Sequence, residues 1–126
     1  MKQFIVLGLG RFGSAVATTL IELGHEVMGV DNDEEIVDAL KDKITQAVQA
    51  DITEERVLTE LGVKNFDAAI VSIATDLETS ILVAMMLKEM GLKYIIAKAQ
   101  NNFPQRWYNG IGLNRANQPK TRSYIS

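Results

Sequence analysis

The sequence contains no cysteine, and this absence excludes several kinds of chemistry. The chain has no disulfide bond, no thiolate nucleophile and no cysteine-ligated metal site. Its one histidine, His25, follows Gly24, where we expect a loop or the start of a strand rather than a catalytic base. Because the sequence offers no cluster of metal-ligating residues either, we assign no catalytic residue and no metal site.

Long apolar runs and a strong excess of charge are also missing. The net charge is −3 over 126 residues, so we expect no nucleic-acid partner. The apolar runs are far shorter than the roughly 18 residues that a membrane span needs. Met1-Lys2-Gln3 leads directly into an apolar stretch, so we expect no signal peptide and a soluble, intracellular protein. With 47% hydrophobic residues, the chain can fill the core of one domain.

The sequence does contain a regular alternation of short apolar runs and amphipathic segments. We predict strands at 3–8, 26–31, 45–50, 67–73 and 94–98, with helices between them, including 12–23 and 76–90. Asn32 or Asp33 is expected to cap the second helix, and Thr53 the third. The helix at 76–90 is apolar around more than one stripe, which suits a core helix and a subunit interface equally well.

Alternating strands and helices predict an α/β fold with a doubly wound, Rossmann-like parallel sheet. The expected strand order is 3-2-1-4-5, with a sixth strand as an open alternative, over residues 1–102. Ligands of such sheets bind outside the carboxyl ends of the strands. Several polar or glycine-rich positions follow predicted strands and would meet at that edge: Gly8–Gly13, Asp31, Asp51, Ser72–Thr75 and Lys98.

The segment Gly8-Leu9-Gly10-Arg11-Phe12-Gly13 is typical of a phosphate-binding turn between a strand and a helix. Gly8 would make the tight turn, Gly10 would let the backbone approach a pyrophosphate, and Gly13 would let the helix pack on the strand. Asp31 ends the second predicted strand, near the roughly 20-residue spacing that a ribose-binding carboxylate shows in this motif. Because it would repel a 2′-phosphate, NADP is disfavoured.

Three further charged residues are expected within or near this turn. Arg11 places a permanent cation within it, which favours a nucleotide with a free terminal phosphate, although simple solvent exposure is the alternative. Lys98 is open to the same two interpretations. Asp51 follows the third strand, where it would accept from an adenine amino group or cap the next helix.

A nucleotide site without catalytic residues or a substrate domain indicates a sensor rather than an enzyme. Two alternatives remain open: a fragment of an NAD-dependent oxidoreductase, and a nucleotide-responsive interaction module with another partner. The predicted nucleotide-contacting residues are Gly8, Gly10, Arg11, Phe12, Gly13, Asp31, Asn32, Asp51, Ile52, Ile73, Ala74, Thr75 and Lys98.

Four stretches of the sequence closely resemble the RCK N-terminal domain, also called KTN or TrkA-N. They are FIVLGLGRFG at 4–13, GHEVMGVD at 24–31, AVQADITEERVLTELGVKNFDAAIVSI at 47–73 and IIAKAQNN at 95–102. The resemblance is nearest to the cytosolic regulatory subunits of bacterial Ktr-type potassium uptake systems. It implies a homodimer that assembles into an octameric ring on a membrane potassium translocator, at the inner face of the cell membrane.

The same resemblance implies the ligands and their contacts. ATP, ADP or NAD(H) would bind each Rossmann unit, with Arg11 and Lys98 at the terminal phosphate of ATP and Asp31 at the ribose. ATP and ADP would favour different ring shapes, which gate the pore. Residues 103–126 are polar and without periodicity, where the family continues with further helices, a strand and a C-terminal lobe. We therefore expect an atypical, irregular tail, from a frame-shifted or truncated gene product or from disorder.

Overall fold

The fold was analysed in a computed structural model that describes residues 1–73 and 77–97. Helices and strands alternate along these residues, as the sequence predicted. The elements are β1 (Gln3–Leu7), α1 (Arg11–Glu22), β2 (Glu26–Asp31), α2 (Glu34–Leu40), β3 (Gln46–Gln49), α3 (Glu55–Glu60), the 3₁₀ helix η1 (Val63–Asn65), β4 (Ala68–Val71), α4 (Leu77–Glu89) and β5 (Ile95–Ala97).

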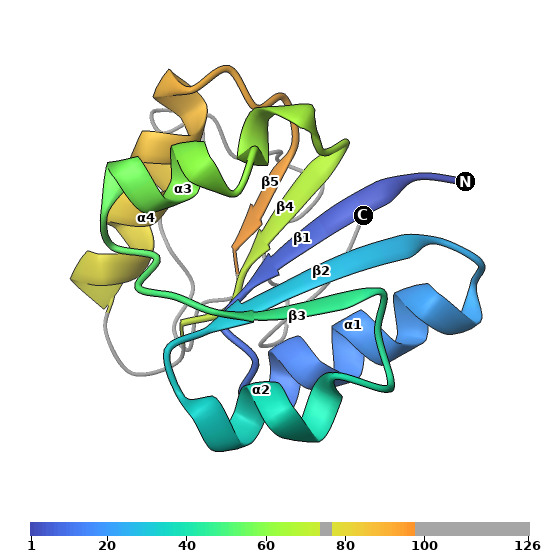
Figure 1. The fold of residues 1–126 in the computed structure, drawn as a ribbon. Coiled ribbons are helices and arrows are strands. Elements are labelled where there is room, and N and C mark those ends of the chain that lie inside the picture. The colour runs from blue at the N-terminus through green and yellow to red at the C-terminus, as the bar shows by residue number, and fades with distance from the viewer. Residues whose placement is uncertain (74–76, 98–126) are drawn as a thin grey trace.

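The strands form one parallel sheet in the order β3-β2-β1-β4-β5, which confirms the predicted topology. The central strand β1 pairs on both sides, so that Leu7 lies opposite Val30 of β2 and Val71 of β4. All strands therefore end at the same edge, which carries the loop between β1 and α1 (Figure 1). The alternative of a sixth strand lies outside the described residues.

Both faces of the sheet are covered by helices, and each face has its own apolar core (Figure 1). Ile5 and Leu7 of β1 point to the face covered by α3 and α4, while Phe4 and Val6 point to the face covered by α1 and α2. This alternation explains why the whole strand is apolar, because a strand buried on both faces has no polar side. The rigid sheet fixes the positions of the loops at its carboxyl edge.

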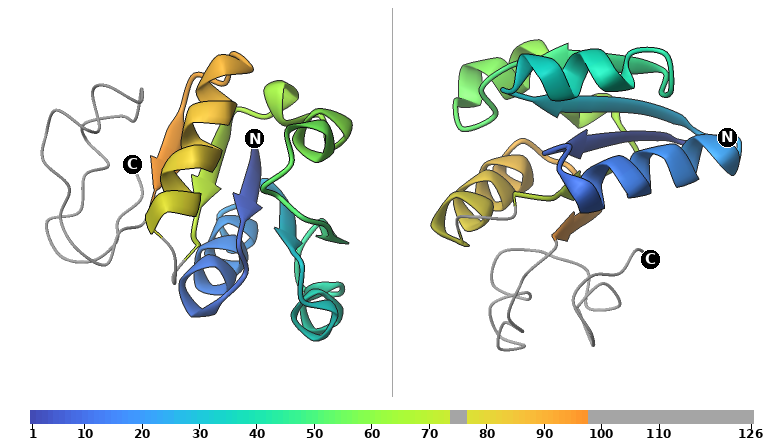
Figure 2. Two further views of the ribbon diagram at one scale, coloured as in Figure 1. Left: turned by 90° about the vertical axis from the view of Figure 1, so that its left-hand side faces the viewer. Right: turned by 90° about the horizontal axis from the view of Figure 1, so that it is seen from below.

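Helix α4 packs along β4 and β5 (Figure 2). Val83, Ala84 and Leu87 on its inner side are buried in the core. Leu82 and Met85 on its outer side remain 50% and 45% exposed. The helix is therefore a core helix with an apolar outer side, and the alternative that this side forms a subunit interface stays a prediction.

The remaining local features agree with the sequence in part. Asp33, rather than Asn32, caps α2, because its carboxylate accepts a hydrogen bond from the Glu35 N–H at 2.9 Å. His25 lies just before β2, where its Nδ1 accepts from the Lys2 N–H at 3.1 Å. The 3₁₀ helix η1 was not predicted. Among the described residues, no helix combines the length and apolar character that crossing a bilayer requires.

Candidate functional site

The loop between β1 and α1 depends on glycine at two positions for steric reasons. Gly8 has a φ of +100°, and a Cβ on it would overlap the carbonyl of Ser72, the residue that follows β4. A Cβ on Gly13 would overlap the Gly8 carbonyl, so the first turn of α1 packs directly on the loop. Gly10 differs, because a Cβ there would meet nothing within 4 Å. The loop is thus closed on its inner side and open at Gly10.

The amino terminus of α1 faces the open side of this loop. Gly10 is the N-cap and supplies no side-chain hydrogen bond, and the first turn holds no acidic residue. Arg11, the first helical residue, is exposed and forms no ion pair with any other described residue. Unpaired N–H groups and the helix dipole give this end partial positive charge. It is therefore suited to an anion such as phosphate.

Asp31, at the end of β2, is half-buried beside the loop. Its Oδ2 accepts a hydrogen bond from the Leu9 N–H at 2.8 Å, and its Oδ1 accepts one from the Asp33 N–H at 2.9 Å. A carboxylate has about four acceptor positions, so each oxygen keeps one for a further donor. Two neighbouring hydroxyl groups, as on a ribose, would match these two positions.

Asp51 and Thr53 form a hydrogen-bonded turn after β3. The Thr53 hydroxyl donates to Asp51 Oδ1 at 2.6 Å, and the Thr53 N–H donates to the same oxygen at 2.9 Å. These two bonds hold the pKa of Asp51 below its ordinary value, because they favour the charged carboxylate. The turn also corrects the expected helix cap: Glu54 occupies the N-cap position of α3, so neither Thr53 nor Asp51 caps that helix.

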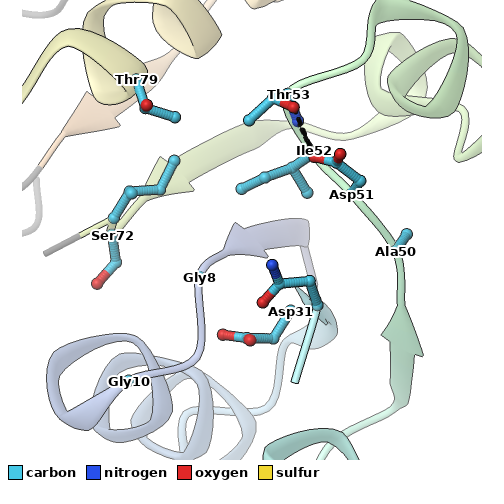
Figure 3. A pocket seen from close by; sticks show the side chains of 11 residues that line it. Gly8, Gly10, Asp31, Ala50, Asp51, Ile52, Thr53, Ser72 and Thr79 are labelled. Atoms are coloured by element: carbon cyan, nitrogen blue, oxygen red, sulfur yellow. Dashed lines mark hydrogen bonds between the residues drawn. The ribbon is translucent and has the colours of Figure 1, made fainter. Parts of the chain in front are cut away.

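These segments enclose a cleft of about 390 Å³ at the carboxyl edge of the sheet. Figure 3 shows Asp31 beside the turn from Gly8 to Gly10, with Asp51, Ser72 and Thr79 around the same space. Its volume lies within the range typical of small-ligand sites. The lining residues are Gly8, Gly10, Asp31, Asn32, Ala50, Asp51, Ile52, Thr53, Ser72, Ile73 and Thr79.

Comparison with known proteins places this fold and cleft in a family. The family model for the TrkA-N domain matches residues 4–119 of the chain. The chain belongs to the TrkA-N domain family. This agrees with the resemblance seen in the sequence, and the match runs past Asn102, where we predicted the Rossmann domain to end.

Curated relatives of this TrkA-N domain include two potassium uptake proteins. The chain is 42% identical over 119 residues to the Ktr system potassium uptake protein A of Bacillus subtilis, covering 94% of the chain and 54% of the relative. It is 36% identical over 119 residues to the protein of the same name from Vibrio alginolyticus, with the same coverage of each. The chain therefore spans about half the length of these relatives.

Solved structures share the fold of this TrkA-N domain at lower identity. The TrkA-N domain of the inner membrane protein ybaL from Escherichia coli superposes with a TM-score of 0.76 at 18% identity, covering 90% of the chain and 84% of that structure. The GsuK channel bound to NAD gives 0.73 at 14% identity, with coverage of 89% and 20%. The Shewanella denitrificans Kef C-terminal domain in an AMP-bound form gives 0.70 at 20%, with coverage of 90% and 69%.

The TrkA-N domain brings seven of the predicted contact residues to the cleft: Gly8, Gly10, Asp31, Asn32, Asp51, Ile52 and Ile73. Arg11 begins α1 beside the cleft but is not one of the residues that line it. Phe12 is half-buried, and Gly13 is buried against Gly8. Ala74, Thr75 and Lys98 lie outside the described residues. The nucleotide contacts assigned to all these residues remain predictions.

Four lining residues were absent from the predicted contact set: Ala50, Thr53, Ser72 and Thr79. Ser72 was recognised at the edge of the sheet without a contact, and Thr53 only as a helix cap. Thr79 lies on α4 and reaches the cleft across the end of β4, which no local pattern in the sequence indicates. Within the described ranges, no group of three or more His, Asp or Glu side chains is placed to hold a metal ion.

Proposed function

We propose that the chain is the nucleotide-binding domain of a regulatory subunit that gates a membrane potassium channel or transporter. The observation that carries this proposal is the cleft in which the open end of α1 and the Asp31 carboxylate lie side by side. Support comes from the potassium uptake proteins among its relatives and from the NAD and AMP in two structures that share its fold.

An adenine nucleotide matches the order of groups along the cleft. Its phosphates would lie at Gly10 and the amino terminus of α1, where the partial positive charge is located. Its ribose hydroxyls would donate to the two free acceptor positions of Asp31. Its base would lie beside Ile52 and Ile73, with Asp51 in reach of the adenine amino group. A 2′-phosphate would meet the Asp31 charge, which disfavours NADP.

Arg11 favours ATP or ADP over NAD(H). A guanidinium binds a terminal phosphate through two parallel hydrogen bonds, and Arg11 has no competing ion pair among the described residues. NAD has no terminal phosphate, because its phosphates are both esterified. Lys98 would assist Arg11 at the same phosphate. NAD(H) remains the second candidate ligand.

The nucleotide would act by shifting an equilibrium between assemblies rather than by chemistry. We propose that the chain is non-catalytic and forms homodimers within an octameric ring, on the cytoplasmic side of the membrane potassium translocator. A ligand shifts such an equilibrium only if it binds one ring shape more tightly than another. ATP and ADP differ in one phosphate, so contacts of Arg11 would supply that difference.

Isothermal titration of ATP, ADP, NADH and NADPH into the wild type and Arg11→Ala tests this proposal. We expect Arg11→Ala to weaken ATP by about tenfold, the effect of losing charge-assisted hydrogen bonds, and to leave NADH nearly unchanged. Lys43→Ala is the control, because it removes one exposed positive charge at the opposite end of the sheet.

Two outcomes would contradict the proposal. Equal weakening of NADH and ATP by Arg11→Ala would exclude a role at a terminal phosphate and favour an oxidoreductase fragment. Absence of any nucleotide binding tighter than about 1 mM would exclude the sensor function and favour an interaction module that responds to something else.

A further inference from the structure

We call the segment Gly8–Gly13 between β1 and α1 the phosphate loop. Leu9, within this loop, is fixed by three separate contacts. Its side chain is 1% exposed, and its two δ-carbons lie so close to Gly29 of β2 that a Cβ on Gly29 would approach them at 2.8 and 3.0 Å. Its carbonyl accepts a hydrogen bond from the Ser14 hydroxyl at 2.7 Å. Its N–H donates to Asp31 at 2.8 Å. The flanking glycines are therefore attached to a fixed residue.

Of the three groups described that contact Leu9, only Asp31 is charged. Its second oxygen accepts from the Asp33 N–H at 2.9 Å, so a single carboxylate links the phosphate loop to the start of α2. Among residues 1–73 and 77–97, no other side chain accepts from either of these two backbone N–H groups. An ionised carboxylate suits this position, because it is an acceptor at both oxygens.

We propose that Asp31 is a positioning residue for the phosphate loop, in addition to its contact with the ribose. Through Leu9 it sets the direction of the Gly8–Gly10 backbone and hence of the open end of α1. The proposal rests on the proposed function, because phosphate is taken as the ligand of the loop. It predicts that Asp31 affects the binding of phosphate even when the ligand has no ribose.

Asparagine is the informative replacement because it keeps the size of aspartate. Its amide has one acceptor oxygen and one donor nitrogen, so it satisfies either the Leu9 N–H or the Asp33 N–H but not both. Simple electrostatics predicts the opposite of our proposal. Removing a negative charge from the cleft would strengthen the binding of an anion.

The experiment measures the binding of inorganic tripolyphosphate, which has neither ribose nor base. We expect Asp31→Asn to weaken tripolyphosphate roughly fivefold to tenfold, the effect of losing one charge-assisted hydrogen bond in the loop. Asp33→Asn is the matched control. It removes one charge two residues away, while asparagine still caps α2 and the backbone N–H of residue 33 is retained. Its binding should stay equal or become tighter.

Hydrogen exchange of the Leu9 amide in the ligand-free protein provides the second readout. Exchange should accelerate about tenfold or more in Asp31→Ala, because alanine accepts from neither N–H and the Leu9 amide becomes free, and should not change in Asp33→Asn. If Asp31→Asn does not fold, the tripolyphosphate binding of Asp31→Ser, with a single acceptor oxygen, is measured with the same expectation.

The proposal would be overturned if Asp31→Asn bound tripolyphosphate as tightly as Asp33→Asn, or if the Leu9 amide of Asp31→Ala exchanged at the wild-type rate. The first result would leave Asp31 with the ribose alone. If the wild type bound neither ATP nor tripolyphosphate, the proposed function would fail, and the Leu9 exchange rate would still decide whether Asp31 positions the loop.

Discussion

The three glycines of the phosphate loop differ in what surrounds their α-carbons. Gly8 and Gly13 lie against backbone carbonyl groups, so any side chain at these positions would strain the loop. Gly10 faces the open cleft and has an ordinary negative φ, so nothing in the fold itself requires glycine. Under the proposed function, a ligand phosphate would occupy the space that a methyl group on Gly10 would fill.

Alanine substitution should separate these two roles. Gly10→Ala is expected to change the free energy of unfolding by no more than about 1 kcal/mol, the range of N-cap exchanges, while weakening ATP at least about tenfold. Gly13→Ala should lower the free energy of unfolding by about 2–3 kcal/mol, because its methyl group overlaps the Gly8 carbonyl. Urea unfolding and ATP titration of both variants provide the measurements. Wild-type affinity in Gly10→Ala would show that no phosphate approaches this position.

Individual site residues were predictable from the sequence only where a local pattern marks them. The glycine spacing and Asp31 follow from the phosphate-loop pattern, because strand, turn and helix are adjacent in the chain. The bond between Asp51 and Thr53 depends on the loop conformation after β3, so the sequence suggested a helix cap instead. Thr79 reaches the cleft only through the packing of α4 against the sheet.

At the level of elements, α4 shows how burial divides one helix into two sides. Leu87 is fully buried between the helix and the sheet, whereas Leu82, on the same helix, is half-exposed. The two residues have the same side chain and the same helix propensity. A comparison of the two therefore isolates the contribution of packing.

Leu87→Ala is expected to lower the free energy of unfolding by about 2–5 kcal/mol, through lost burial and a residual cavity. Leu82→Ala should cost less than about 1 kcal/mol, because its side chain loses little contact within the described chain. Urea unfolding at low protein concentration gives both values. A large effect of Leu82→Ala that appears only at high protein concentration would place this residue in an interface between copies. Equal effects at low concentration would contradict the packing of α4.

The order and direction of the strands followed from the sequence because alternating elements with right-handed crossovers allow few arrangements. The element boundaries were less predictable. The start of α3 depends on which polar residue caps it, and both Thr53 and Glu54 precede a suitable apolar pattern. The 3₁₀ helix η1 has too few residues for a periodicity and follows Gly62 in a left-handed conformation.

At the scale of the whole molecule, the proposed function requires that nucleotide binding and assembly influence each other. Under the proposed function the cleft is the input of a switch, so the effect of ATP would have to reach other copies or the membrane partner. Linkage makes this requirement measurable: if association changes the affinity for ATP, then ATP changes association by the same factor.

We therefore expect the chain to associate, and its ATP affinity to depend on its concentration. Light scattering after size exclusion should give a mass above the 13.9 kDa of one chain at tens of micromolar. The dissociation constant for ATP, measured below and above the association midpoint, should differ by about fivefold or more, as for typical couplings between sites. Arg11→Ala, with its terminal-phosphate contact removed, should reduce that difference while the mass of the ligand-free protein stays the same. A strict monomer would contradict ring assembly by this chain, and equal ATP affinities on both sides of the midpoint would show that the cleft does not report to the assembly.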